Sequence, residues 1–305
     1  MKTRRQFLSG SVSAAAGLAA AGCQASTSSD FIDAHVHVWT PDTQQYPLAS
    51  NHTKDQMKPA SFTPEELFAH ARPAGVSRIV LIQMSFYGFD NSYMLEVMKR
   101  YPGVFGGVAV IDEHAPDVVS TMVKLKGLGV RGFRIRATKA MAEGWPESAG
   151  MVEMWKAGAE HEISMCLLAD PDSLPGALKM CRQFPDTPVV IDHFARIGVS
   201  GVIHQADVDQ LSRFADCPKV KVKTSAFYAL GRKTVPYDDL GPMIKQLRDA
   251  FGPERLMWAS DCPYQVVDGH RYADSIALIR DRLDFLTEDD KRWMLRKTAE
   301  SVFFG

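Results

Sequence analysis

The sequence contains few cysteines for its length and no paired cysteine motif. Among its 305 residues there are five cysteines, and none of them forms a C-x-x-C pair. This spacing gives neither a zinc knuckle nor a disulfide-stapled scaffold. Because cysteine behaves as a small apolar residue in protein interiors, we expect Cys166, Cys181, Cys217 and Cys262 to be buried free thiols.

An excess of charge of either sign is also absent. The chain carries 35 Lys and Arg against 36 Asp and Glu, for a formal net charge of −1. No global field would therefore attract nucleic acid or an anionic membrane. We expect a small-molecule substrate and no nucleic-acid partner. The sequence leaves the oligomeric state open.

The uncharged run Ser9–Gly22 is too short to cross a bilayer as a helix, which needs about 20 apolar residues. It follows Thr3–Leu8, which contains two adjacent arginines before Phe-Leu. This combination resembles a twin-arginine (Tat) export signal, which carries proteins across the membrane already folded. We expect residues 1–29 to be this signal and a short polar linker, and residues 30–305 to form one domain.

The apolar run ends at Ala20-Ala21-Gly22-Cys23, which resembles a lipoprotein processing box with Cys23 as the lipidated residue. The branched residue usual in such boxes is missing at Ala20, so cleavage without lipidation stays open. The predicted location is the periplasm, either free or held at the membrane by a lipid anchor on Cys23.

Short β-branched runs alternate with longer amphipathic stretches from Phe31 onward. The predicted strands are Phe31–Val38, Arg78–Met84, Val104–Ile111, Val130–Arg136, Ile163–Leu168, Val189–Asp192, Val220–Thr224 and Leu256–Ser260. The predicted helices include Thr63–Arg72, Ser92–Tyr101, Pro116–Leu128, Pro171–Phe184 and Asp239–Phe251. A strand followed by a helix, repeated about eight times, is typical of a TIM (β/α)8 barrel. The main rival is an open doubly wound sheet, although no Gly-x-Gly-x-x-Gly follows the first strand.

A last helix is predicted over Glu288–Phe303 and is expected to pack across the outside of the barrel. Active sites of such barrels lie at the carboxyl ends of the strands. Reactive side chains at strand ends are therefore the candidates for the site.

The first strand ends in a His-x-His pair. Period-two alternation places Asp33, His35 and His37 on one face, and Ile32, Ala34, Val36 and Val38 on the other. We expect the apolar set to face the helices, so that both histidines project into the barrel mouth. Two imidazoles in this position can act on one ion or on one carbonyl oxygen.

Two further strand ends carry reactive groups. His193 closes the sixth predicted strand and shares parity with Val189 and Ile191, while Asp261 follows the eighth and shares a face with Met257 and Ala259. We expect both to point inward. Three histidines and one carboxylate would then meet at the catalytic rim.

These segments resemble a known family. Ile32–Trp39, the strand that ends at His193, and Trp258–Pro263 are similar to motifs of the amidohydrolase superfamily, in its amidohydrolase-2 branch. Gln83–Ser92 and Val130–Arg134 resemble its lactonase-like group.

That group includes 2-pyrone-4,6-dicarboxylate lactonase and sugar-lactone hydrolases. The resemblance extends from about Asp33 to Phe304 in matching order. It implies hydrolysis of a lactone or related cyclic ester, with Asp261 as general base for water. His35, His37 and His193 would polarise the carbonyl and stabilise the oxyanion.

The resemblance also bears on metals. Binuclear relatives add a carboxylated lysine or a glutamate on the fourth strand and a histidine on the fifth. Here Arg134-Ile135-Arg136 ends the fourth strand, and Ile163–Leu168 contains no histidine, so a binuclear centre is not expected. One Zn²⁺ held by His35, His37, His193 and Asp261 stays open. Some members of the group work without metal, and the site is expected to use either no cofactor or one divalent ion.

Substrate contacts are expected from strand ends and loops. Arg134 and Arg136 share a strand face and could hold a substrate carboxylate bidentately, which predicts an anionic substrate. Lys221 and Lys223 share a face of the seventh strand with Ser225, and a buried lysine there would need a partner. The other candidates are Arg131 (binding or structural), Ser85, Tyr87, Tyr228 and Tyr264.

The chain departs from the dicarboxylate lactonase at one point. That enzyme has a loop tyrosine shortly after the His-x-His pair, whereas Asn51–Asp55 here contains none, and Tyr46 is displaced. The substrate therefore need not be the same dicarboxylate. Two other activities stay open: a metal-dependent non-oxidative decarboxylase of the same branch, and a barrel that binds a small molecule without catalysis.

Overall fold

Eight parallel β-strands alternate with helices along residues 30–305, the part of the chain that the computed structural model describes. The predicted export signal and the lipid anchor at Cys23 lie outside these residues and stay predictions. Within residues 30–305 no helix has both the length and the apolar character needed to cross a membrane.

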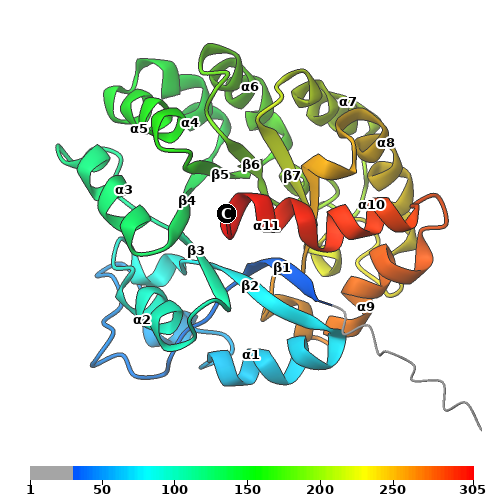
Figure 1. Ribbon diagram of the computed structural model, residues 1–305, viewed down its shortest axis with the longest axis horizontal. Helices are drawn as coiled ribbons and strands as arrows, with labels where there is room; N and C mark the ends of the chain where they lie inside the picture. The colour runs from blue at the N-terminus through cyan, green and yellow to red at the C-terminus, as the bar shows by residue number, and fades with distance from the viewer. Residues whose placement is uncertain (1–29) are drawn as a thin grey trace, which may run out of the picture.

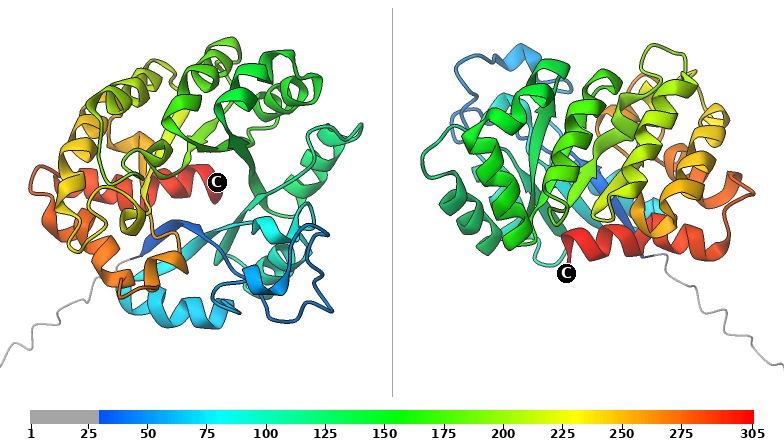
Figure 2. Two further views of the ribbon diagram at one scale, coloured as in Figure 1. Left: turned by 180° about the vertical axis from the view of Figure 1, so that it is seen from behind. Right: turned by 90° about the horizontal axis from the view of Figure 1, so that it is seen from above.

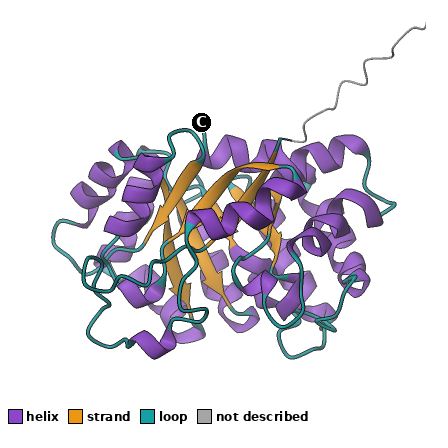
Figure 3. Ribbon diagram, turned by 90° about the horizontal axis from the view of Figure 1, so that it is seen from below, coloured by secondary structure: helices purple, strands orange, loops and turns teal. Residues whose placement is uncertain are grey.

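The strands form one sheet in the order of the sequence, from β1 to β8 (Figure 1). Helices surround this sheet (Figure 3). Their bounds are β1 Phe31–Val36, β2 Val76–Ile82, β3 Phe105–Ala109, β4 Val130–Ala137, β5 Ser164–Ala169, β6 Val189–Ile191, β7 Val220–Ser225 and β8 Leu256–Ala259. The helices are α1 Pro64–Ala71, α2 Ser92–Arg100, α3 Val118–Gly127, α4 Lys139–Gly144, α5 Ala149–Glu160, α6 Leu174–Gln183, α7 Gln205–Ser212, α8 Gly241–Phe251, α9 Tyr272–Ala277, α10 Glu288–Arg292 and α11 Thr298–Phe303.

Just beyond β8 the chain returns to β1 and closes the barrel. The His37 amide donates to the Cys262 carbonyl over 2.8 Å, and the Asp261 amide donates to the His35 carbonyl over 2.9 Å. The predicted TIM (β/α)8 barrel is thus confirmed. A doubly wound sheet is excluded, since its strand order would reverse at a switch point.

Apolar side chains lie in two layers, one on each side of the strands. The larger layer packs between barrel and helices. The smaller fills the barrel interior with Ile32, Ala34, Val80, Ile82, Val108, Cys166, Val190, Met257 and Ala259. All four cysteines of the described residues are buried free thiols, as predicted.

The C-terminal helix closes one end of the barrel, and the expectation that it packs across the outside is wrong. The segment from α10 through a π-helical turn to α11 crosses the barrel axis in Figure 1 and runs along one end of the barrel in Figure 2. Phe303 belongs to the interior layer. A Cβ atom on Gly106 would lie 3.0 Å from the Phe303 carbonyl oxygen, so glycine at this position of β3 leaves room for the close approach of the helix. The amphipathic pattern could not distinguish the two positions, since both bury one helix face.

Shortening Phe303 to leucine is expected to lower the free energy of unfolding by about 1–2 kcal/mol, because it leaves a cavity among side chains that cannot fully collapse. Urea denaturation measures the loss. Leu128→Ala, at a side chain that is 55% exposed, serves as control and should change stability by less than about 0.5 kcal/mol. Equal stability of the two variants would show that Phe303 does not seal the barrel end.

Candidate active site at the carboxyl ends of the strands

His35 reaches the barrel interior through an irregularity in β1. The pairing of β1 with β2 shifts register between Asp33 and Val36. Ile32 and Ala34 face the interior, whereas Asp33 points outward and accepts a hydrogen bond from Tyr272 of α9 over 2.6 Å. Strict alternation from those residues would have turned His35 outward as well.

Beyond this register shift the side chains of β1 alternate again, but the odd-numbered residues now face the barrel interior. Val36 lies in the outer layer, and both His35 and His37 project into the mouth. The predicted position of the histidines is therefore correct. The expectation that Ile32 and Ala34 face the helices is wrong, because a register shift reverses the facing of every later side chain.

His193 also owes its position to irregular backbone. Val189 and Ile191 lie in the outer layer, so parity with them would point His193 away from the site. The strand ends at Ile191, and His193 then adopts a left-handed conformation with φ 51° and ψ 46°. The left-handed turn brings His193 back into the mouth, where Asp192 already lies on the inward parity of Val190. His193 therefore lies at its predicted location, but not for the predicted reason, because Val189 and Ile191 face outward.

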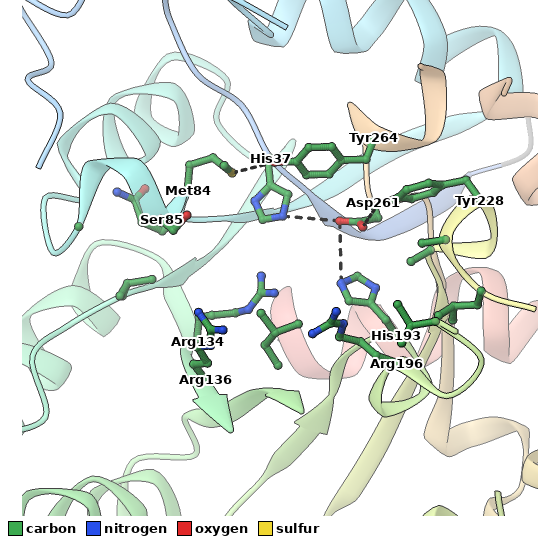
Figure 4. Close-up of a pocket in the computed structure, with 18 of the residues that line it drawn as sticks. His37, Met84, Ser85, Arg134, Arg136, His193, Arg196, Tyr228, Asp261 and Tyr264 are labelled. Atoms are coloured by element: carbon green, nitrogen blue, oxygen red, sulfur yellow. Dashed lines mark hydrogen bonds and ion pairs between the residues drawn. The ribbon is translucent and has the colours of Figure 1, made fainter. Parts of the chain in front are cut away.

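Asp261 follows β8 and faces inward with Met257 and Ala259, as predicted. Its backbone is also left-handed, with φ 65°. In the mouth its carboxylate lies close to all three imidazoles, of which Figure 4 shows those of His37 and His193. Asp261 Oδ1 lies 3.5 Å from His35 Nε2, 3.6 Å from His37 Nε2 and 3.9 Å from His193 Nε2.

The hydrogen bonds at Nδ1 make the three histidines inequivalent. His37 Nδ1 lies 2.8 Å from the Ile82 carbonyl oxygen. Since a carbonyl only accepts, this nitrogen carries the proton, and a neutral His37 presents a lone pair at Nε2. His193 Nδ1 lies 2.8 Å from Ser225 Oγ, a hydroxyl that can donate or accept.

The third imidazole has a lysine as its neighbour. Lys223 Nζ lies 3.1 Å from His35 Nδ1. Because an ammonium only donates, a bond between these atoms requires the proton of a neutral His35 to sit on Nε2. The Nε2 atoms of His35 and His37 are 3.2 Å apart, so His35 donates to His37.

Beneath His35 lies a charged cluster formed by Asp192, Lys223 and Arg134. Lys223 Nζ is 3.0 Å from Asp192 Oδ1, and Arg134 Nε is 3.4 Å from Asp192 Oδ2. Both the lysine and the aspartate are fully buried. The prediction that a buried lysine on this strand would need a partner is confirmed, and the partner is Asp192.

The surroundings keep both carboxylates ionised. Burial alone would raise the pKa of Asp261, but the surrounding imidazoles of His193, His37 and His35 outweigh burial and hold the pKa below its usual value. Burial likewise opposes ionisation of Asp192, and Lys223, His35 and Arg134 reverse the effect, so that its pKa lies well below the usual value.

Two imidazoles and one phenol are shifted toward their neutral forms. Burial, followed by the charge of Lys223, lowers the pKa of His35 well below its usual value, and burial also lowers the pKa of His193. Burial and the Asp261 charge raise the pKa of Tyr228. Tyr228 therefore keeps its proton and donates it to Asp261 Oδ2 over 2.7 Å.

A pocket of about 610 Å³ opens above these groups. Of the residues predicted to contact substrate, five line it: Ser85, Arg134, Arg136, Tyr228 and Tyr264. Figure 4 shows Arg134 directed from β4 toward His193 and Asp261. Its Nη1 lies 3.3 Å from His35 Nε2.

Two candidate substrate contacts lie outside the pocket: Tyr87, against the prediction, and Arg131, for which a structural role was left open. Arg131 has the outward parity of Phe133, and its guanidinium donates to the backbone carbonyls of Lys126 and Val130 over 3.2 Å, so it is structural. Tyr87 is buried in the outer layer, where its hydroxyl accepts a hydrogen bond from the Thr40 amide. The chain turns after β2, which directs Tyr87 away from the mouth.

Sequence reasoning did not assign Asp192 or Arg196 to the site. Arg196 lines the pocket and pairs with Asp170 over 2.9 Å. Asp192 shares the inward parity of Val190, and this pattern could have identified it. The prediction that Val189, Ile191 and His193 face inward instead directs Asp192 outward. Arg196 gives no such signal, because its position depends on the turn after β6.

The family model described as Amidohydrolase matches residues 32–305. The chain belongs to the amidohydrolase family. The resemblance recognised from the His-x-His, His193 and Asp261 segments is thereby confirmed. The match spans nearly all of the described residues, and every group of the site described above lies within it.

Several curated relatives of this amidohydrolase are lactone hydrolases. A 4-sulfomuconolactone hydrolase of Rhizobium radiobacter is 28% identical over 234 residues, covering 76% of this chain and 75% of the relative. An L-fucono-1,5-lactonase of Burkholderia ambifaria is 27% identical, covering 78% and 82%. A 2-pyrone-4,6-dicarboxylate hydrolase of Comamonas testosteroni is 24% identical, covering 80% of each chain.

Solved structures share the barrel. An amidohydrolase of Burkholderia multivorans with bound zinc superposes with a TM-score of 0.74 at 18% identity, covering 90% of this chain and 99% of the other. A 2,6-dihydroxybenzoate decarboxylase from Rhizobium superposes with a TM-score of 0.64 at 11% identity, covering 90% and 98%. At these identities the likeness concerns the fold alone.

Proposed function

We propose that this amidohydrolase opens the ring ester of an anionic lactone, with Asp261 as the general base. One observation carries the proposal: an ionised, buried carboxylate faces three imidazoles at the floor of a pocket that arginines also line. The lactone hydrolases among the curated relatives support the same reaction class.

In the proposed reaction Asp261 removes a proton from a water molecule as its oxygen attacks the lactone carbonyl. The carbonyl oxygen becomes an oxyanion, which needs hydrogen-bond donors. Arg134 Nη1 faces the mouth as a permanent donor, and His193 donates from Nε2 when Ser225 donates to its Nδ1. Asp261 then returns the proton to the ring oxygen as the ester bond breaks, and the product is a hydroxy acid.

One group orients the base and another holds the substrate. Tyr228 fixes the carboxylate of Asp261 through Oδ2 and leaves Oδ1 facing the imidazoles. The guanidinium of Arg136 lines the pocket and is exposed. It makes no ion pair with any carboxylate of residues 30–305. Arg136 is therefore the proposed anchor for a substrate carboxylate.

The site could hold a single metal ion. The Asp261 Oδ1 atom lies 3.5–3.9 Å from the three Nε2 atoms, and His35, His193 and Asp261 form a group able to hold an ion. A bound zinc ion would polarise the carbonyl and lower the pKa of water.

Lys223 opposes metal ligation by His35. While it donates to Nδ1, the proton of a neutral His35 occupies Nε2, and no lone pair remains there for a metal. Ligation would require His35 Nδ1 to donate to Asp192 Oδ1 instead, now 3.5 Å away. We propose that hydrolysis proceeds without a metal.

Hydrolysis of a panel of carboxylated and sugar-derived lactones tests both proposals, when combined with elemental analysis of the purified protein. We expect turnover of at least one carboxylated lactone, with activity kept after dialysis against a chelator. Loss of activity with recovery on adding Zn²⁺ would contradict the metal-free reaction. Decarboxylation that requires the ion would instead favour the decarboxylase, and tight binding without turnover would favour a non-catalytic barrel.

A further inference from the structure

Part of the pocket lining has no role in the proposed reaction. The imidazoles, Asp261 and the arginines account for the ester and one carboxylate. The sector of the mouth above β2 and β3 has different chemistry, since Met84, Phe89 and Val110 line it. Along the rim, this apolar sector adjoins β4, which carries Arg136.

Phe89 is unusually exposed for its side chain. Of the large hydrophobic residues in the described part of the chain, seven are exposed, and Phe89 is the most exposed at 58%. It is also the one aromatic residue among those seven, and it lines the pocket above the catalytic groups. Fully burying a phenylalanine side chain gains about 1.5–3 kcal/mol, so a ligand that covers Phe89 would bind more tightly.

The backbone holds Phe89 in this exposed position. The Phe89 carbonyl accepts a hydrogen bond from Asn91 Nδ2 over 3.0 Å. The Asn91 side chain also makes two hydrogen bonds with the backbone of Val110. Its Nδ2 donates to the Val110 carbonyl over 2.8 Å, and its Oδ1 accepts from the Val110 amide over 3.0 Å. Just before Phe89, Gly88 has φ +57°, and its amide donates to the Ser85 carbonyl over 2.9 Å. The exposed ring is therefore tied to the end of β3 by a fixed turn.

We propose that the substrate is amphiphilic: a lactone with a carboxylate for Arg136 and, beside it, an alkyl or aryl substituent that covers Phe89 and packs against Met84 and Val110. This inference rests on the proposed lactone hydrolysis for the position of the ring. It adds a binding subsite and a substrate class that the catalytic groups do not define. A sugar lactone, which presents hydroxyl groups, would leave Phe89 uncovered.

The test compares a δ-lactone carboxylate with its phenyl-substituted derivative. The wild-type protein is expected to favour the phenyl derivative in kcat/KM. Phe89→Ser should lower the ratio of the two kcat/KM values by about tenfold, which corresponds to about 1.4 kcal/mol. Leu128→Ser removes an apolar side chain of similar exposure, 55%, outside the pocket, and should leave the ratio unchanged. An unchanged ratio in Phe89→Ser would overturn the subsite.

A binding measurement separates this proposal from the proposed function. Calorimetry with the corresponding lactams, carboxylated and with or without the phenyl group, reports on the subsite even if no lactone is hydrolysed. A preference for the phenyl lactam that Phe89→Ser abolishes, without any hydrolysis, would support the subsite and refute the hydrolase. Hydrolysis of both lactones with equal kcat/KM, and equal affinity for both lactams, would support the hydrolase and refute the subsite.

Discussion

Asp261→Asn is expected to reduce kcat for lactone hydrolysis by about 10²–10⁴-fold, because an amide cannot accept the proton of the attacking water. The substitution keeps the size of the side chain, and the amide oxygen can still accept the hydrogen bond from Tyr228. The loss should therefore appear in kcat without unfolding. Steady-state kinetics on the best lactone of the panel measure it.

The control for this variant is Asp209→Asn, on the surface of α7. Asp209 accepts hydrogen bonds from Gln205 and Gln246 and lies outside the pocket. It should leave kcat unchanged. Near-wild-type turnover in Asp261→Asn would remove the carboxylate from the proposed mechanism, whatever the lactone.

Lys223→Met is expected to destabilise the fold by about 3–5 kcal/mol, because it leaves the fully buried carboxylate of Asp192 without its nearest cation. The methionine side chain fills much of the same volume, so most of the loss comes from the uncompensated charge. Urea denaturation measures the free energy of unfolding. Combining the change with Asp192→Asn, which removes that charge, should restore a large part of the stability.

An exposed ion pair provides the matched comparison. Lys245 and Asp249 lie one turn apart on α8, with Nζ and Oδ2 at 2.6 Å, and both side chains are about half exposed. Lys245→Met should cost no more than about 0.5 kcal/mol, because solvent already screens this pair. If Lys223→Met were as mild, or if the double variant were no more stable than the single one, Asp192 would not be an ionised partner of Lys223.

The barrel was predictable because its signal is repeated. Each strand is a short β-branched run and each helix a longer amphipathic one, so an error at one boundary leaves the alternation intact. β1 ends two residues earlier than predicted and β2 begins two residues earlier. Neither error affects the order of the strands, and that order places the strand ends at one rim.

The orientation of individual side chains was less predictable, because it depends on single backbone irregularities. A register shift in β1 turns His35 inward although Ile32 and Ala34 already face the interior. A left-handed turn does the same for His193. Strict alternation correctly placed Asp261. The register shift in β1 and the turn at His193 have no periodic signature in the sequence. Strict alternation extended across them therefore predicts the direction of a side chain only by chance.

The sequence by itself determined the fold, the family and the four reactive groups at the rim, since a barrel brings the ends of its parallel strands together whatever the loops do. Tertiary structure alone decided what surrounds those groups. It paired Lys223 with Asp192, excluded Arg131 and Tyr87, added Arg196, and laid the C-terminal helix across the barrel end. These outcomes depend on contacts between residues distant in the chain, where burial requires each charge to find a partner and each apolar face a surface.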